Sequence, residues 1–138
     1  MQQQQQARAT EFFGRTYGEA MTLLVEARDY LAHREPIERQ GLLPPARLRM
    51  SCETMRLTAR LTQIMGWLLS QRAVYEGELT AEAALDGQDV LAEVEVCMAD
   101  DAALTAELPQ RLRHLLERSR RLFIRVARLD ELARRQID

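Results

Sequence analysis

Apolar residues recur along the chain with the period of α-helices in three long segments. These segments cover about residues 11–33, 45–77 and 107–134. In each one, apolar side chains return every three or four positions, which places them on one face of a helix. No segment shows the convincing two-residue alternation that is typical of strands. The pattern therefore predicts an all-α protein. The apolar face of the first segment consists of Phe13, Tyr17, Ala20, Leu24, Ala27 and Leu31.

Proline and glycine lie where these helices are expected to begin and end. Pro44 and Pro45 suit a helix start, where the missing N–H costs no hydrogen bond. Gly77 suits a helix end, and Pro36 follows the predicted end of the first helix. The middle helix would be about 50 Å long, which requires partners that run alongside it. We therefore expect an antiparallel three-helix bundle with long helices.

The length of 138 residues corresponds to a single domain. Residues 1–10 begin with Met and five Gln, and this low-complexity composition predicts a disordered start. Residues 11–138 are expected to form one helical-bundle domain. The chain contains no apolar run of about 18–20 residues, the length that spans a bilayer, and no secretory signal pattern. These features predict a cytoplasmic protein.

Charge is distributed unevenly, although the net charge is only −2. Residues 76–107 contain 10 acidic residues and no basic one, whereas residues 108–138 contain 9 Arg and 4 acidic residues. An acidic segment followed by an Arg-rich helix favours charge matching within the protein. Nucleic-acid binding through the Arg faces of the third helix is an alternative, but the chain as a whole lacks the net basic character typical of such proteins.

The acidic connection between the second and third helices covers residues 78–106. Thr80 is placed to cap a short turn through Ala84, because its hydroxyl can accept a backbone N–H. Gln88–Met98 has the pattern of a short fourth helix. Asp86-Gly87 and Asp100-Asp101 are typical of breaks between such elements.

Small residues recur at intervals of seven in the second helix, at Cys52, Ala59, Gly66 and Ala73. Such a stripe lets a neighbouring helix approach closely, at a crossing angle near +20°. We therefore expect a buried seam here, with an inert Cys52 thiol inside it. A wide apolar arc is expected to supply the rest of the core. It consists of Met55, Leu57, Leu61, Ile64, Met65, Leu68 and Leu69.

The opposite face of the second helix carries polar residues and the single tryptophan of the chain, Trp67. An apolar anchor within a polar face is typical of an interface hot spot, where Trp and Arg are enriched. The alternative is that a neighbouring loop or the first helix covers Trp67. On the first interpretation, the partner-binding residues are Arg56, Arg60, Gln63, Trp67 and Gln71.

Residues that carry catalysis or bind metals are sparse and not grouped by sequence. Neither His33 nor His114 has a Glu three residues earlier, so the Glu-x-x-His di-iron motif is absent. The chain also lacks His-Glu-x-x-His, Cys-x-x-Cys and a Gly-rich phosphate loop. Cys52 and Cys97 do not form a disulfide framework. We expect a protein that is not an enzyme and uses no cofactor or metal.

Two stretches of the second helix combine apolar, Arg and Trp positions in a characteristic order. They are ETMRLTARL at Glu53–Leu61 and GWLLSQRAV at Gly66–Val74. This pattern resembles the alphaproteobacterial regulator-of-CtrA-degradation (RcdA-like) family. The segments around Met21–Leu31 and Leu108–Asp130 are also similar to that family. The likeness extends over most of the chain and includes no catalytic signature.

The resemblance implies a small three-helix bundle that forms a homodimer. It also implies an accessory role in regulated proteolysis, in which an adaptor helps to deliver cell-cycle regulators to the ClpXP protease. The expected partners are then proteins: the protease or other adaptors, and the regulators that serve as cargo. The alternatives are a structural or signalling oligomer without a role in protease delivery, and a helical binder of nucleic acid or of a small molecule.

Overall fold

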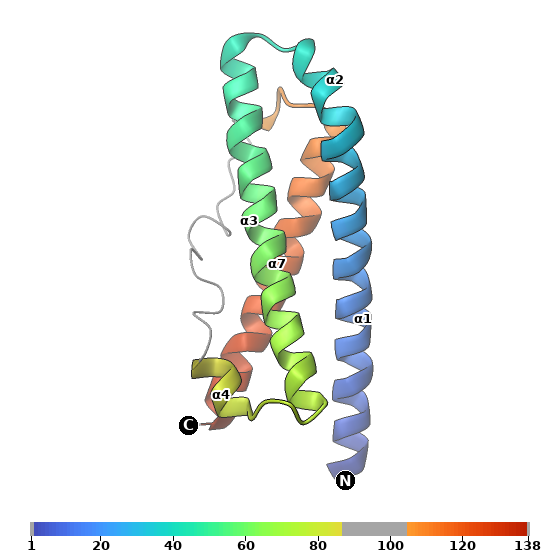
Figure 1. Ribbon diagram of the computed structural model, residues 1–138, viewed down its shortest axis with the longest axis vertical. Helices are drawn as coiled ribbons and strands as arrows, with labels where there is room; N and C mark the ends of the chain where they lie inside the picture. Colours follow the sequence, from blue (N-terminus) through green and yellow to red (C-terminus); the bar gives the residue numbers. More distant parts are fainter. Residues whose placement is uncertain (1, 87–104, 138) are drawn as a thin grey trace.

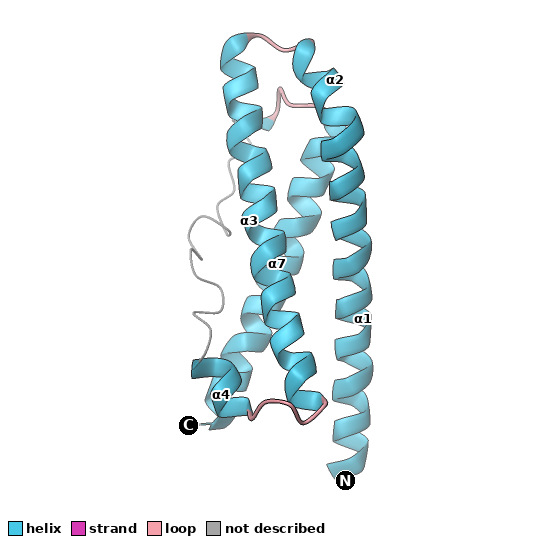
Figure 2. Cartoon of the chain, viewed as in Figure 1, coloured by secondary structure: helices cyan, strands magenta, loops and turns pink. Residues whose placement is uncertain are grey.

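Three long helices lie side by side in the computed structural model, which describes residues 2–86 and 105–137 (Figure 1). Within these residues the regular structure is entirely helical (Figure 2). The prediction of an all-α bundle is therefore confirmed. The elements are α1 (Gln2–Asp29), a π-helical turn (Tyr30–Arg34), α2 (Glu35–Gln40), α3 (Pro44–Tyr75), α4 (Ala81–Asp86) and α7 (Gln110–Ile137).

The first helical stretch, from Gln2 to Gln40, extends beyond its predicted range of 11–33 at both ends. Its start at Gln2 includes residues that were predicted to be disordered, and Gln has a favourable helix propensity. At the other end, the chain continues helically through Pro36 to Gln40. Proline interrupts the hydrogen bonds of a helix and clashes with the preceding turn. The π-helical turn ends at Arg34, two residues before Pro36.

Tyr30 fastens the π-helical turn to α2. The N–H of Glu35 donates to the Tyr30 carbonyl, which is the five-residue spacing of a π-helix. The buried Tyr30 hydroxyl donates to Glu38 Oε2 over 2.7 Å. Burial, together with the neighbouring Glu38 carboxylate, raises the pKa of Tyr30 above its ordinary value. The tyrosine is therefore held in its neutral, hydrogen-bond-donating form.

The second long helix, α3 (Pro44–Tyr75), closely matches its predicted range of 45–77. Gly77 has a φ of 79°, the left-handed conformation that glycine adopts at little cost. The N–H of Gly77 donates to the Val74 carbonyl, and that of Glu78 donates to the Ala73 carbonyl. This is the Schellman arrangement that ends many helices.

The described part of the acidic connection contains one short helix, α4. The N–H of Ala83 donates to Thr80 Oγ1 over 3.0 Å, so Thr80 caps α4 as predicted. The predicted helix over Gln88–Met98 and the predicted breaks at Gly87 and at Asp100-Asp101 lie outside the described residues.

The directions of the helices differ in one respect from the predicted antiparallel bundle. α1 is antiparallel to α7, because Glu19 contacts Arg125 while the later Glu26 contacts the earlier Arg118. It is antiparallel to α3 as well (Figure 1). In contrast, α3 and α7 run parallel, because residues later in α3 contact residues later in α7. These contacts are Arg60 with Ser119 and Trp67 with Asp130.

Parallel α3 and α7 place the end of α3 and the start of α7 at opposite ends of the bundle (Figure 1). A short turn cannot join such helices, whereas a long crossover connection can. The 34 residues from Glu76 to Pro109 supply that length. The predicted antiparallel order overlooked this possibility.

The core lies where the three long helices meet. Leu57, Ile64 and Leu68 of the predicted apolar arc are fully buried there. Met55 and Leu69 of the same arc are instead 72% and 50% exposed, so the arc was placed too far around the helix. The other buried members of this core are Ala20, Leu23, Ala27, Tyr30, Met50, Leu61, Trp67, Leu108, Leu112, Leu115, Leu116, Leu122, Phe123 and Val126.

We predict that Gly77→Ala lowers the free energy of unfolding by about 1 kcal/mol, because an alanine side chain is strained at positive φ. The matched control is Gly14→Ala in α1, where an added Cβ meets no atom within 4 Å. That change should raise stability by up to about 1 kcal/mol. Urea unfolding at one fixed protein concentration measures both values, and equal effects of the two changes would contradict the assignment.

Candidate interaction surfaces

The predicted partner-binding stripe of α3 lies largely inside the bundle. Arg60 and Trp67 are only 2% and 5% exposed, and both contact α7. Arg56, Gln63 and Gln71 are partly buried. Because its two central residues are covered by the protein itself, this stripe is not an exposed hot spot, and that interpretation of its geometry was wrong. The cover comes from α7, which the sequence did not indicate.

Arg60 and Trp67 form two polar contacts between α3 and α7, here called the polar seam. Arg60 Nη1 donates to the Leu116 carbonyl over 2.9 Å and to Ser119 Oγ over 3.2 Å. Trp67 Nε1 donates to Asp130 Oδ1 over 3.0 Å. The other oxygen of Asp130 accepts a hydrogen bond from Arg134 Nε. Each buried donor of the seam therefore has a defined acceptor, as burial of polar groups requires.

Glu53 is a third buried polar residue of α3, seven positions before Arg60. Both of its carboxylate oxygens accept hydrogen bonds from Arg56 Nη1 over 2.9 Å. Arg49 Nε lies 3.9 Å from Glu53 Oε1. Two guanidinium groups thus compensate the charge of one carboxylate that is 1% exposed.

The exposed side of α3 is apolar. Leu48, Met55, Thr62 and Leu69 recur at intervals of seven and form what is here called the outer α3 face. Leu48 is 68% exposed, close to the value for Met55. Exposed apolar side chains that recur on one helix face are typical of protein interaction sites when they form a patch.

The predicted small-residue seam belongs to this outward side and not to the core. A Cβ added at Gly66 would meet no atom within 4 Å, and Cys52 is exposed. Within residues 2–86 and 105–137, no helix packs closely along this stripe at Gly66, so the expected buried seam is not found among the described residues. The core uses the other side of α3, where larger side chains fill the space between the helices.

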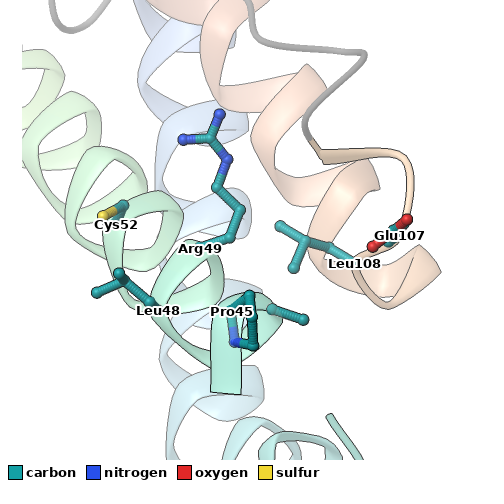
Figure 3. Close-up of a pocket in the computed structure, with 7 residues that line it drawn as sticks. Pro45, Leu48, Arg49, Cys52, Glu107 and Leu108 are labelled. Carbon is teal, nitrogen blue, oxygen red and sulfur yellow. The ribbon is translucent and has the colours of Figure 1, made fainter. Parts of the chain in front are cut away.

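A pocket of about 370 Å³ lies at one end of the outer α3 face, between the start of α3 and the segment that leads into α7 (Figure 3). Pro45, Leu48 and Leu108 supply apolar walls, and Arg49 contributes a guanidinium group. The composition suits an apolar side chain better than a reacting substrate. Cys52 and Glu107 also line the pocket.

A second groove, of about 400 Å³, runs between α1 and α7. Arg125 Nη1 lies 2.6 Å from Glu19 Oε2, and Arg118 pairs with Glu26. Both pairs are about half exposed. The Arg-rich third helix thus finds acidic partners on the first helix, whereas the sequence favoured a match with the acidic connection.

Metal and membrane chemistry have no candidate among the described residues. Over residues 2–86 and 105–137, no group of three His, Cys, Asp or Glu side chains is arranged to hold a metal ion. The helices in the same ranges include none with the length and apolar character needed to cross a bilayer. His33 and His114 are both exposed and lie on different helical elements.

Comparisons with known proteins identify relatives of this architecture. Residues 4–138 match a family model described as protein of unknown function DUF1465. The crystal structure of RcdA from Caulobacter crescentus CB15 is similar, with 40% sequence identity and a TM-score of 0.72. That similarity covers 88% of this chain and 89% of the RcdA chain. A search of curated proteins gave no match.

We predict that Trp67→Ala lowers the free energy of unfolding by about 3–5 kcal/mol, because it removes a buried ring and the donor to Asp130. The control is Leu132→Ala on α7, which is 54% exposed and should change stability by about 0.5 kcal/mol or less. Chemical unfolding followed by far-UV circular dichroism checks both. A Trp67→Ala protein with unchanged stability would restore the exposed-anchor interpretation.

Proposed function

Because the chain belongs to the DUF1465 family and is an RcdA-like protein, we propose that it is a non-enzymatic adaptor that acts through protein–protein contacts. The relationship to RcdA over nearly the whole chain carries this proposal. The exposed apolar face on a rigid bundle supports it, since an adaptor needs surfaces and not reacting groups. Its setting would be the cytoplasm of an alphaproteobacterium.

The specific role that we propose is assistance in delivering cell-cycle regulators to the ClpXP protease. An adaptor of this kind forms and breaks no covalent bond. It raises the effective concentration of cargo at the protease by contacting both, which can strengthen a weak encounter by orders of magnitude. Two separate docking surfaces are the minimum requirement for such a task.

We further propose that the outer α3 face mediates a homodimer. In an antiparallel pair of α3 helices centred on Thr62, Met55 of one copy would lie opposite Leu69 of the other, and the reverse. A two-fold interface requires this self-complementarity. The small side chains of the predicted seam, including Ala59 and Gly66, would let the two helices approach closely.

The threonines of α3 fit this apolar role. The hydroxyl of Thr62 donates to the Thr58 carbonyl over 2.8 Å, and that of Thr58 donates to the Thr54 carbonyl over 2.9 Å. Because these hydroxyls bond to their own helix, covering them leaves no donor without an acceptor. The face can therefore be buried at low polar cost.

Met55→Glu is expected to convert the dimer to a monomer, because it would place one buried charge from each copy in the apolar contact. The matched control is Ile37→Glu on α2, which is similarly exposed at 70% but lies off the outer α3 face. Light scattering coupled to size exclusion measures the mass. A dimer that survives Met55→Glu, or a monomeric wild type, would rule out this interface.

Delivery is tested by reconstituted degradation of a labelled cell-cycle regulator by ClpXP. The proposal expects faster degradation when the protein is added, with no cleavage by the protein alone. The control reaction contains a second substrate that the protease degrades without an adaptor, and its rate should not change. No acceleration of any regulator, with a folded dimer present, would favour the structural or signalling oligomer instead.

A further inference from the structure

The solvent side of α7 carries a continuous row of basic residues. Eight positions of α7 share this side, at alternating steps of three and four from Arg111 to Arg135. Seven of them are Arg or His, the eighth is Leu132, and all eight are exposed. From Arg111 to Arg135 the row extends about 36 Å along the helix. This row is here called the basic stripe and consists of Arg111, His114, Arg118, Arg121, Arg125, Arg128 and Arg135.

We propose that the basic stripe binds an acidic segment of a partner protein, seated along α7 and in the groove between α1 and α7. This inference rests on the proposed adaptor role, because it adds the chemical character of one protein partner to that role. It names a different surface from the outer α3 face. The occupant is a protein segment because the stripe is a single row with acidic neighbours, on a chain whose net charge is negative.

The groove beside the stripe already accommodates carboxylates. Glu19 and Glu26 stand seven residues apart on α1 and reach Arg125 and Arg118, which are also seven residues apart. Each of these arginines uses only its Nη1 atom in these contacts. A guanidinium has five N–H donors, so further carboxylates can bind from the open side. The internal pairs thereby hold the arginine side chains in position for a partner.

The shape of the groove favours an elongated occupant. Leu23 and Leu122 are buried residues that line it, and Gly18 leaves open space where a side chain would otherwise project. Arg121 stands on the same wall and pairs with Glu117 of its own helix. A helix with acidic residues at every third and fourth position would match the spacing of the stripe.

The test uses a fluorescent helical peptide of about 24 residues, with Glu at every third and fourth position along one face, and anisotropy measured at low salt. Arg121→Gln together with Arg128→Gln should weaken binding by about tenfold, the combined effect of two exposed charge pairs. The matched control is Arg28→Gln with Arg113→Gln. It removes the same charge from exposed positions outside the stripe and should leave the affinity within about twofold.

A second pair of variants distinguishes recognition from general stability. Glu19→Gln with Glu26→Gln frees Arg125 and Arg118, so it should tighten peptide binding even as it removes two contacts between the helices. A role limited to holding α1 on α7 predicts no gain in affinity. Weaker binding near physiological ionic strength, where the Debye length is about 8 Å, is expected for the wild type.

Three outcomes would overturn the proposal. These are no binding of the acidic peptide at low salt, equal losses in the stripe variant and its control, and tighter binding of a single-stranded DNA of equal charge that depends on the same arginines. The last result would assign the stripe to nucleic acid. None of these measurements involves the protease or the oligomeric state, so failure here leaves the adaptor proposal to be judged by its own assays.

Discussion

The polar seam between α3 and α7 is the constraint on which the rest of the structure depends. Two parallel helices packed only through leucines can slide by a turn at small cost, because apolar contacts are not directional. Arg60 and Trp67 need specific acceptors, at Leu116, Ser119 and Asp130, and a slip by one turn would leave charged or polar groups buried without them. The seam therefore selects one register of α7 against α3. Selecting a register is the best-attested role of buried polar residues in helix packing.

The direction of α7 determines which surfaces remain free. Because α7 runs parallel to α3, the seam and the apolar core cover one side of α3, and α1 completes that cover. The opposite side keeps Leu48, Met55 and Leu69 in solvent. On α7 the corresponding outward side is basic and apolar only at Leu132. One packing arrangement thus produces two exposed surfaces with different chemistry.

Much of the fold followed from local signals in the sequence. The period of the apolar residues indicated three helices, and Pro44 and Gly77 lie close to the ends of α3 because their backbone preferences are strong and local. The direction of α7 did not follow, since a connection of about 30 residues permits either direction. The π-helical turn before Pro36 was also missed, because proline is a more reliable sign of a helix end than of a widened turn.

The error in the candidate site had a definite cause. Trp67 and Arg60 were placed on a polar face opposite the apolar arc, although each directly precedes a buried apolar residue, Leu68 and Leu61. Their positions lie at the edge of the core, where only the location of the third helix decides between burial and exposure. The reverse error placed Met55 and Leu69 inside, because an apolar side chain alone does not report its direction.

The separation of the two exposed surfaces has a consequence for how such a bundle can work. An apolar face is buried by a partner of matching shape and depends little on salt, whereas a row of arginines attracts acidic partners from a distance and releases them as ionic strength rises. Placed on different helices of one rigid body, the two surfaces need not compete for the same partner. A bundle that dimerises through α3 would present the basic stripe twice. A partner with two acidic segments could then bind both stripes of one dimer. Its overall affinity would exceed that of either contact, while each single contact stays readily reversible.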